Sequence, residues 1–126
     1  MKTLLTLEAF IEIAAGAGAL VVPVFAVSLL LGSTLENAAA VIVARVTGAA
    51  LITIGMMNWA GRGEPNGRVA KGLVAGMVFY NVAVVGLFVY ACFGAGLSGI
   101  GLWPAVVLHV GMAAWCLASI RRRFLR

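Results

Sequence analysis

The sequence predicts an all-α membrane protein, a four-transmembrane-helix bundle with both termini in the cytoplasm. Of the 126 residues, 63% are hydrophobic and only 10% are charged, whereas a soluble domain is about half apolar and about a quarter charged. The length suits four spans, because each membrane helix needs about 20 apolar residues. Despite a net charge of +5, the composition excludes a soluble domain, a disordered chain and a nucleic-acid-binding domain.

Stretches without charge locate the spans, because a charged side chain at the bilayer centre costs about 2.5–3.5 kcal/mol. Residues 13–35, 46–61 and 72–120 form three such stretches. The third is too long for one crossing and must fold back within its glycine-rich part, residues 94–101. We therefore expect one transmembrane domain over residues 1–126, with spans at residues 4–31, 35–60, 69–93 and 102–120.

Local signals mark the ends of these spans. Ser33 and Glu36 fit a capping box that would start the second helix. The polar residues 61–67 predict a turn between the second and third spans. Pro104 fits the first turn of the fourth helix, where its missing N–H costs little. Pro23 lies inside the first span and is expected to kink it.

The basic residues predict the orientation. Eight of the nine lie on one side of the predicted bundle, so the positive-inside rule places both termini in the cytoplasm. Four of them, at the end of the chain, are also candidates for contact with anionic lipid headgroups, although they equally serve as a charge signal that fixes topology. The eight are Lys2, Arg62, Arg68, Lys71, Arg121, Arg122, Arg123 and Arg126.

Two carboxylates lie in the first span, where ionisable groups are functional candidates by default. Glu8 and Glu12 are four residues apart and share one helix face. They would bind a cation or carry protons; alternatively, Glu8 reaches the headgroups and Glu12 bonds to a neighbouring helix. Both interrupt the apolar core that a signal peptide requires, so we expect the span to be retained. The small residues 14–19 allow close approach of a helix or a ligand.

Arg45 is the most costly residue in the second span. Its stem either snorkels to the outer headgroups, with Glu36 as a partner, or points into the bundle and holds an anion. The third span contains a GxxxG motif at Gly72 and Gly76, which serves packing within the chain or dimerisation equally well.

Asn81 and His109 fall near mid-membrane on adjacent antiparallel spans, where they can form a hydrogen bond. They would form a polar clamp between helices, a proton relay or, through His109, a haem site. Haem would need a second axial ligand from another chain. Cys92 and Cys116 lie at different depths, which excludes a disulfide between them, and no residues have metal-ligand spacing. We therefore expect no metal, and no cofactor apart from the haem alternative.

Several short strings stand out together: Pro23 followed by LLLG at 29–32, ARVTGAAL at 44–51, Tyr80 with Asn81, and LWP at 102–104 with His109. In these strings the chain resembles small four-helix inner-membrane proteins of bacteria. The resemblance implies the fold, the topology and the bacterial inner membrane as location. It implies no activity, cofactor or partner.

Three functional hypotheses remain, and none is enzymatic because no catalytic constellation is found. The first is a non-catalytic accessory or structural subunit of a homo- or hetero-oligomeric membrane assembly. The second is an oligomeric transporter of a small solute, proton-coupled through Glu8 and Glu12, with Arg45 as a gate or anion contact. The third is a binder of a hydrophobic cofactor or haem near Asn81 and His109.

Overall fold

The computed structural model describes residues 1–124 and the side chains of residues 1–121, so Arg126 and the side chains of Arg122 and Arg123 lie outside the description. Every regular element in this part is helical. Four of the five helices are long and apolar enough to cross a membrane, the exception being the short α2. The helices are α1 (Lys2–Val21), α2 (Pro23–Leu31), α3 (Ala38–Gly61), α4 (Arg68–Phe93) and α5 (Leu102–Phe124).

Pro23 breaks the first predicted span instead of kinking it. The chain leaves the helix at Val22, whose φ of −125° and ψ of 57° are not helical, and Pro23 starts α2 as its first residue. Proline lacks an N–H and disfavours helical geometry in the residue before it, which ends α1 at this point. With 20 residues, α1 still spans about 30 Å.

The second long helix starts later than the expected capping box would place it. Asn37 is the N-cap of α3, and its side-chain oxygen accepts a hydrogen bond of 2.8 Å from the Ala40 N–H. Ser33 and Glu36 lie before the helix in the connecting loop. The prediction of a box at Ser33 was wrong because Asn37, a strong N-cap residue, lies closer to the apolar run.

Glycines bring the backbones of α1 and α3 into direct contact. A Cβ on Gly16 would lie 2.6 Å from the Gly48 carbonyl oxygen, and one on Gly48 would lie 2.5 Å from the Leu20 nitrogen. Further along, a Cβ on Gly55 would lie 2.9 Å from the Ala9 oxygen. The small residues predicted for close packing thus pack against α3, as helices do in lipid when small side chains face each other.

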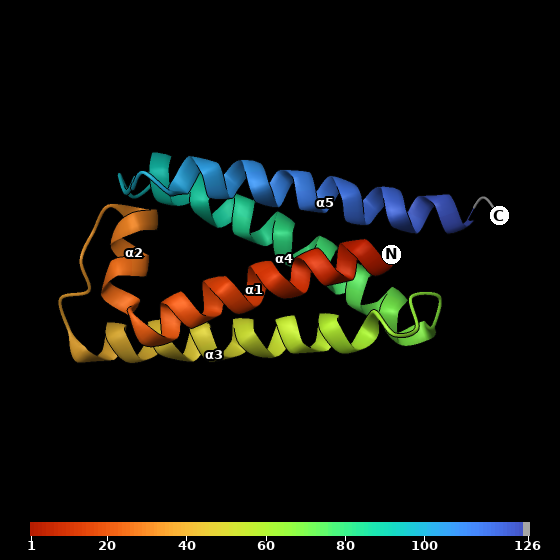
Figure 1. The fold of residues 1–126 in the computed structure, drawn as a ribbon. Helices are drawn as coiled ribbons and strands as arrows, with labels where there is room; N and C mark the ends of the chain where they lie inside the picture. The colour runs from red at the N-terminus through yellow and green to blue at the C-terminus, as the bar shows by residue number, and fades with distance from the viewer. Residues whose placement is uncertain (125–126) are drawn as a thin grey trace.

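The opposite side of α1 packs against α4 and α5, so α1 runs between α3 and the α4–α5 pair (Figure 1). Side chains from all three helices form the core at this junction. Its buried members are Leu4, Leu5, Ala70, Val74, Met77, Met112 and Cys116. Because α1 contacts helices on both sides, few of its polar groups can face lipid.

Helix α2 closes one end of the bundle together with the loop before α5. The N–H groups of Gly99 and Gly101 donate to the carbonyls of Leu30 and Leu29 at 3.0 and 2.8 Å. Gly99 has no room for a Cβ against the Leu29 carbonyl. These bonds satisfy two of the last carbonyls of α2, which have no partner within the helix.

The other end of the molecule carries the basic residues. Figure 1 shows the start of α1, the turn between α3 and α4, and the end of α5 at the same end of the bundle. Lys2, Arg62, Arg68, Lys71 and Arg121 lie there. At the opposite end, residues 32–37 and 94–101 contain no lysine or arginine.

We predict that Gly48→Ala lowers the free energy of unfolding by about 1–3 kcal/mol, because the new methyl forces the α1 and α3 backbones apart. Gly86→Ala is the matched control, since a Cβ there meets nothing within 4 Å. Reversible unfolding in mixed micelles with increasing dodecyl sulfate measures both variants. Equal stability of the two would contradict the close helix contact.

Candidate functional site

Polar side chains from three helices gather inside the bundle, although their surroundings are apolar. Glu8 and Glu12 come from α1, Asn81 from α4, and His109 and Cys116 from α5. Glu8, Glu12 and Asn81 are each 1% exposed. We call these five residues, together with Tyr80 of α4, the buried polar cluster.

The predicted hydrogen bond between Asn81 and His109 is present, with 2.7 Å between Asn81 Oδ1 and His109 Nδ1. The Asn81 amide nitrogen donates to the Met77 carbonyl at 2.8 Å, which fixes the orientation of the amide. Since Asn81 Oδ1 only accepts, His109 Nδ1 must carry the hydrogen. This joins α4 and α5 as the polar clamp interpretation requires.

The His109 ring is also enclosed by aromatic side chains. Tyr80 and Phe88 pack edge-on against it, with ring centroids 5.8 and 6.3 Å away. An amide does not readily pass a proton on, so Asn81 positions His109 and separates it from the carboxylates.

Glu8 is buried and does not reach the headgroups, so that part of the alternative was wrong; its other part, a bond from Glu12 to a neighbouring helix, agrees with the Tyr80 hydroxyl of α4 beside Glu12. Glu8 Oε1 accepts long hydrogen bonds from Asn81 Nδ2 and from the Cys116 thiol, both at 3.4 Å. The cause is the position of α1 between α3 and the α4–α5 pair, which leaves this face no path to lipid. One oxygen of Glu8 therefore links all three helices.

Glu12 lies one turn further into the bundle, with the Tyr80 hydroxyl and Glu8 as neighbours. Its second oxygen, Oε2, has no hydrogen-bond partner among the described residues. Among the described residues, the side chains that interact with Glu8 or Glu12 include no lysine and no arginine. These two carboxyl groups are thus buried together without a basic partner among the residues whose side chains are described.

Asn58 of α3 is fully buried and is also unsatisfied. Neither its amide nitrogen nor its oxygen has a partner among the described residues. It follows Gly55 by one turn on the face that packs against α1, where the antiparallel register places it level with Glu8. An unpaired buried amide costs about 1–3 kcal/mol per group, so this position favours a ligand, a water molecule or a proton-dependent partner.

Other predicted residues lie away from the buried polar cluster. Arg45 is exposed on α3, so the interpretation in which it points into the bundle was wrong. At the surface the free-energy cost of the charge is lower, because the long stem can carry the guanidinium toward water. Arg121 is exposed at the basic end, as headgroup contact requires. The two cysteines, Cys92 and Cys116, are both free.

Sequence reasoning missed three members of this arrangement. Asn58 has no charge and lies near the end of its span, so a search for charges passes over it. Tyr80 was noted beside Asn81 in a sequence string but not as a member of the site, and Cys116 was considered only for disulfides and metals. For Cys116 the available signal was helical spacing, because it follows His109 by two turns.

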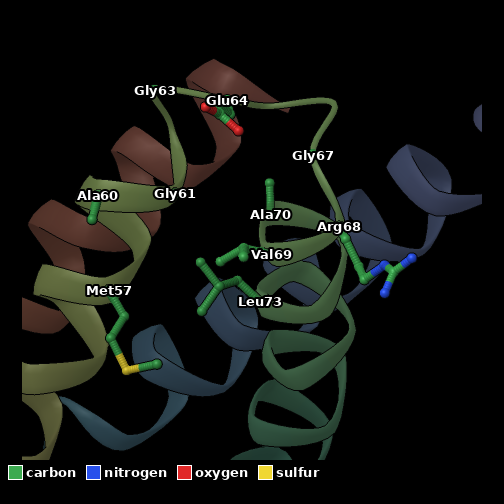
Figure 2. A pocket seen from close by; sticks show the side chains of 10 residues that line it. All are labelled: Met57, Ala60, Gly61, Gly63, Glu64, Gly67, Arg68, Val69, Ala70 and Leu73. Atoms are coloured by element: carbon green, nitrogen blue, oxygen red, sulfur yellow. The ribbon is translucent and has the colours of Figure 1, made fainter.

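A hollow lies at the basic end, between the end of α3 and the start of α4 (Figure 2). Its volume is about 690 Å³, and apolar side chains and glycines form most of its wall. Two charged residues, Glu64 and Arg68, line it. It is separate from the buried polar cluster, because none of its lining residues belongs to that cluster.

Comparison with protein-family models, with curated proteins and with solved structures gave no match to this chain. The assignment of function therefore rests on the residues and their geometry.

We predict that Asn81 and His109 stabilise the fold as a pair. A double-mutant cycle with Asn81→Leu and His109→Leu should give a coupling energy between about 0.6 and 2 kcal/mol, the range of hydrogen bonds between membrane helices. The control cycle pairs His109→Leu with Asn37→Ala, an exposed cap on α3, and should be additive. Additive effects of Asn81→Leu and His109→Leu in the same unfolding assay would contradict the bond.

Proposed function

We propose that the protein binds and releases a proton or a small cation at Glu8 and Glu12, as part of an oligomeric transporter of a small solute. The observation that supports this most is the unpaired Glu12 Oε2 on a side chain that is only 1% exposed. An ionised carboxylate with an unsatisfied oxygen and no opposite charge is costly in an apolar interior. A proton or a bound cation removes this cost.

The two carboxyl groups act on the same ligand in this proposal. Glu8 has its Oε1 occupied by two donors, so Glu12 is the group with free bonding capacity. Buried carboxyl groups this close titrate as a pair, and the proton belongs to the pair. Glu12 is ten residues from Lys2, which places it about 15 Å along α1 from the basic end.

The orientation follows from the charge. We propose that the basic end faces the cytoplasm, because the positive-inside rule assigns lysines and arginines to that side. Both termini then lie in the cytoplasm, and α2 lies at the outer surface. Following the resemblance to bacterial proteins, we propose the bacterial inner membrane as the location.

We predict that Glu12→Gln abolishes proton uptake by vesicles that contain the protein, because the amide keeps the shape but binds no proton. A pH-sensitive dye inside the vesicles measures uptake after an external acid pulse. Glu36→Gln is the control: this exposed loop residue lies before α3, and its loss should leave uptake unchanged.

The same preparation tests cations by replacing the acid pulse with a sodium or potassium gradient. Unchanged proton uptake in Glu12→Gln would exclude the coupling role. Wild-type vesicles that match protein-free vesicles under all three gradients would contradict transport by this protein.

A second candidate function is a non-catalytic accessory or structural subunit of a homo- or hetero-oligomeric membrane assembly. The observation that favours it is the GxxxG motif of α4: a Cβ on Gly72 or Gly76 would meet nothing within 4 Å. Packing within the chain therefore does not use the motif, contrary to one of its two interpretations. Small residues on a free helix face are typical of contacts between membrane helices.

We predict that the protein extracted in a native nanodisc-forming polymer has a fixed stoichiometry by native mass spectrometry. Gly76→Leu should shift it toward the monomer, because the larger side chain prevents close helix approach. Gly111→Leu on α5, also in open space, is the control. A wild-type monomer without a partner would contradict the accessory role, and an oligomer unaffected by Gly76→Leu would exclude this face.

A further inference from the structure

Asn58 lies where α3 meets both α1 and α4. Gly61, three residues later on the same face of α3, would place a Cβ 2.5 Å from Leu73 Cδ1 of α4 and 3.9 Å from Leu5 Cδ1 of α1. Ile54, four residues before Asn58 on this face, packs against the core that α1, α4 and α5 share. Asn58 itself is 0% exposed, so its side chain is enclosed between α1, α3 and α4.

Glu12 lies on the same side of this junction, further from the basic end. On α1 it follows Leu5 by seven residues, which is two helical turns, so the two side chains share a face. On α4, Tyr80 follows Leu73 by the same seven residues, and its hydroxyl is a neighbour of Glu12. Both helices start at the basic end (Figure 1). Leu5 and Leu73 therefore form one layer of side chains. Glu12 and Tyr80 form another, two turns further from that end.

The directions of the side chains bring Asn58 and Glu12 toward each other. On α3, Asn58 lies between Gly61, which belongs to the first layer, and Gly55, which meets Ala9 of α1. Asn58 is therefore located between the two layers. Helical side chains lean toward the N-terminus of their own helix. Since α1 and α3 are antiparallel, Asn58 leans away from the basic end and Glu12 leans toward it, so their polar atoms approach the same space.

Three polar atoms at this place have no hydrogen-bond partner among the described residues. They are Glu12 Oε2, Asn58 Oδ1 and Asn58 Nδ2. The amide nitrogen donates, whereas the amide and carboxylate oxygens accept. Water suits all three atoms, because it both donates and accepts and because buried water is held by a few such polar groups. A metal cation would find only the two oxygens, which is fewer than an ion such as calcium needs.

We propose that Asn58 and Glu12 hold buried water between α1, α3 and α4. One water molecule accepts from Asn58 Nδ2 and donates to Glu12 Oε2, and a further one donates to Asn58 Oδ1. An amide does not readily pass a proton on, so Asn58 positions the water and the water carries the proton. A proton that arrives on this water passes to Glu12 and leaves the water neutral. This proton step rests on the proposed function, whereas the water site does not.

Water-edited solid-state NMR of the full chain in lipid tests the site, because it detects nuclei that receive magnetisation from nearby water. The chain contains four asparagines and no glutamine, so labelling asparagine with nitrogen-15 gives four side-chain amide signals. We expect rapid transfer to Asn58, as to the exposed Asn37 and Asn66. Asn81 is the matched control: it is also buried, but its amide already donates to two oxygens, so transfer should be weak. A signal of Asn58 as weak as that of Asn81 would overturn the water site.

The link to Glu12 is measured by labelling glutamate with carbon-13 in Asn58→Leu, which keeps the size of the side chain and removes both polar atoms. We expect the Glu12 carboxyl carbon to receive magnetisation from water in the wild type and to lose it in Asn58→Leu, with slower proton uptake by vesicles. If this variant does not fold, Asn58→Ala removes the same two atoms. Asn66→Leu, in the exposed turn, is the control and should change neither readout.

The two readouts separate this inference from the proposed function. Unchanged transfer to Glu12 in Asn58→Leu would overturn the shared water, and unchanged proton uptake after loss of the water would overturn its role as proton carrier. Wild-type vesicles without proton uptake would contradict the proposed function alone, because the NMR signals decide the water site without any transport.

Discussion

The backbone contact between α1 and α3 determines what the rest of α1 can do. Gly16 and Gly48 allow no side chain between the two helices, so the residues on that face of α1 are committed to α3. Leu4, Leu5 and Glu8 must then meet α4 and α5. Glu12 lies four residues after Glu8 on the same face and therefore has no route to water either. Close helix packing and the burial of charge are thus two results of one arrangement of small residues.

The sequence predicts most of the fold because a bilayer limits the choices. Charge-free stretches and the glycine-rich loop at residues 94–101 led to four long helices. The ends of the first two spans differ from the prediction because several nearby residues can each end or start a helix there. Pro23 ends α1 through its missing N–H, and Asn37 caps α3 better than Ser33. Such competition depends on which of several nearby residues finds its partner, and hydrophobicity patterns do not contain that information.

The candidate site was predictable only in part. Asn81 and His109 could be paired by counting depth along two antiparallel helices, and the structure contains that bond. The position of Glu8 could not be derived in the same way, because it depends on how α1 rotates between its neighbours. The burial of Asn58 against α1 depends on the register between α1 and α3. The contact between Gly55 and Ala9 determines this register, and it is known only from the structure.

The hydrogen-bond inventory of the buried polar cluster favours a proton over a metal cation as the ligand. Glu12 Oε2 is an unpaired acceptor, and the Asn81 amide and the Cys116 thiol already donate to Glu8. A proton on Glu12 turns an acceptor into a donor and adds almost no volume. A sodium or calcium ion needs several oxygens arranged around it at about 2.3–2.6 Å. With Glu8 and Glu12 each 1% exposed, closely packed helices must separate to admit such an ion, whereas a proton needs only a side-chain rotation.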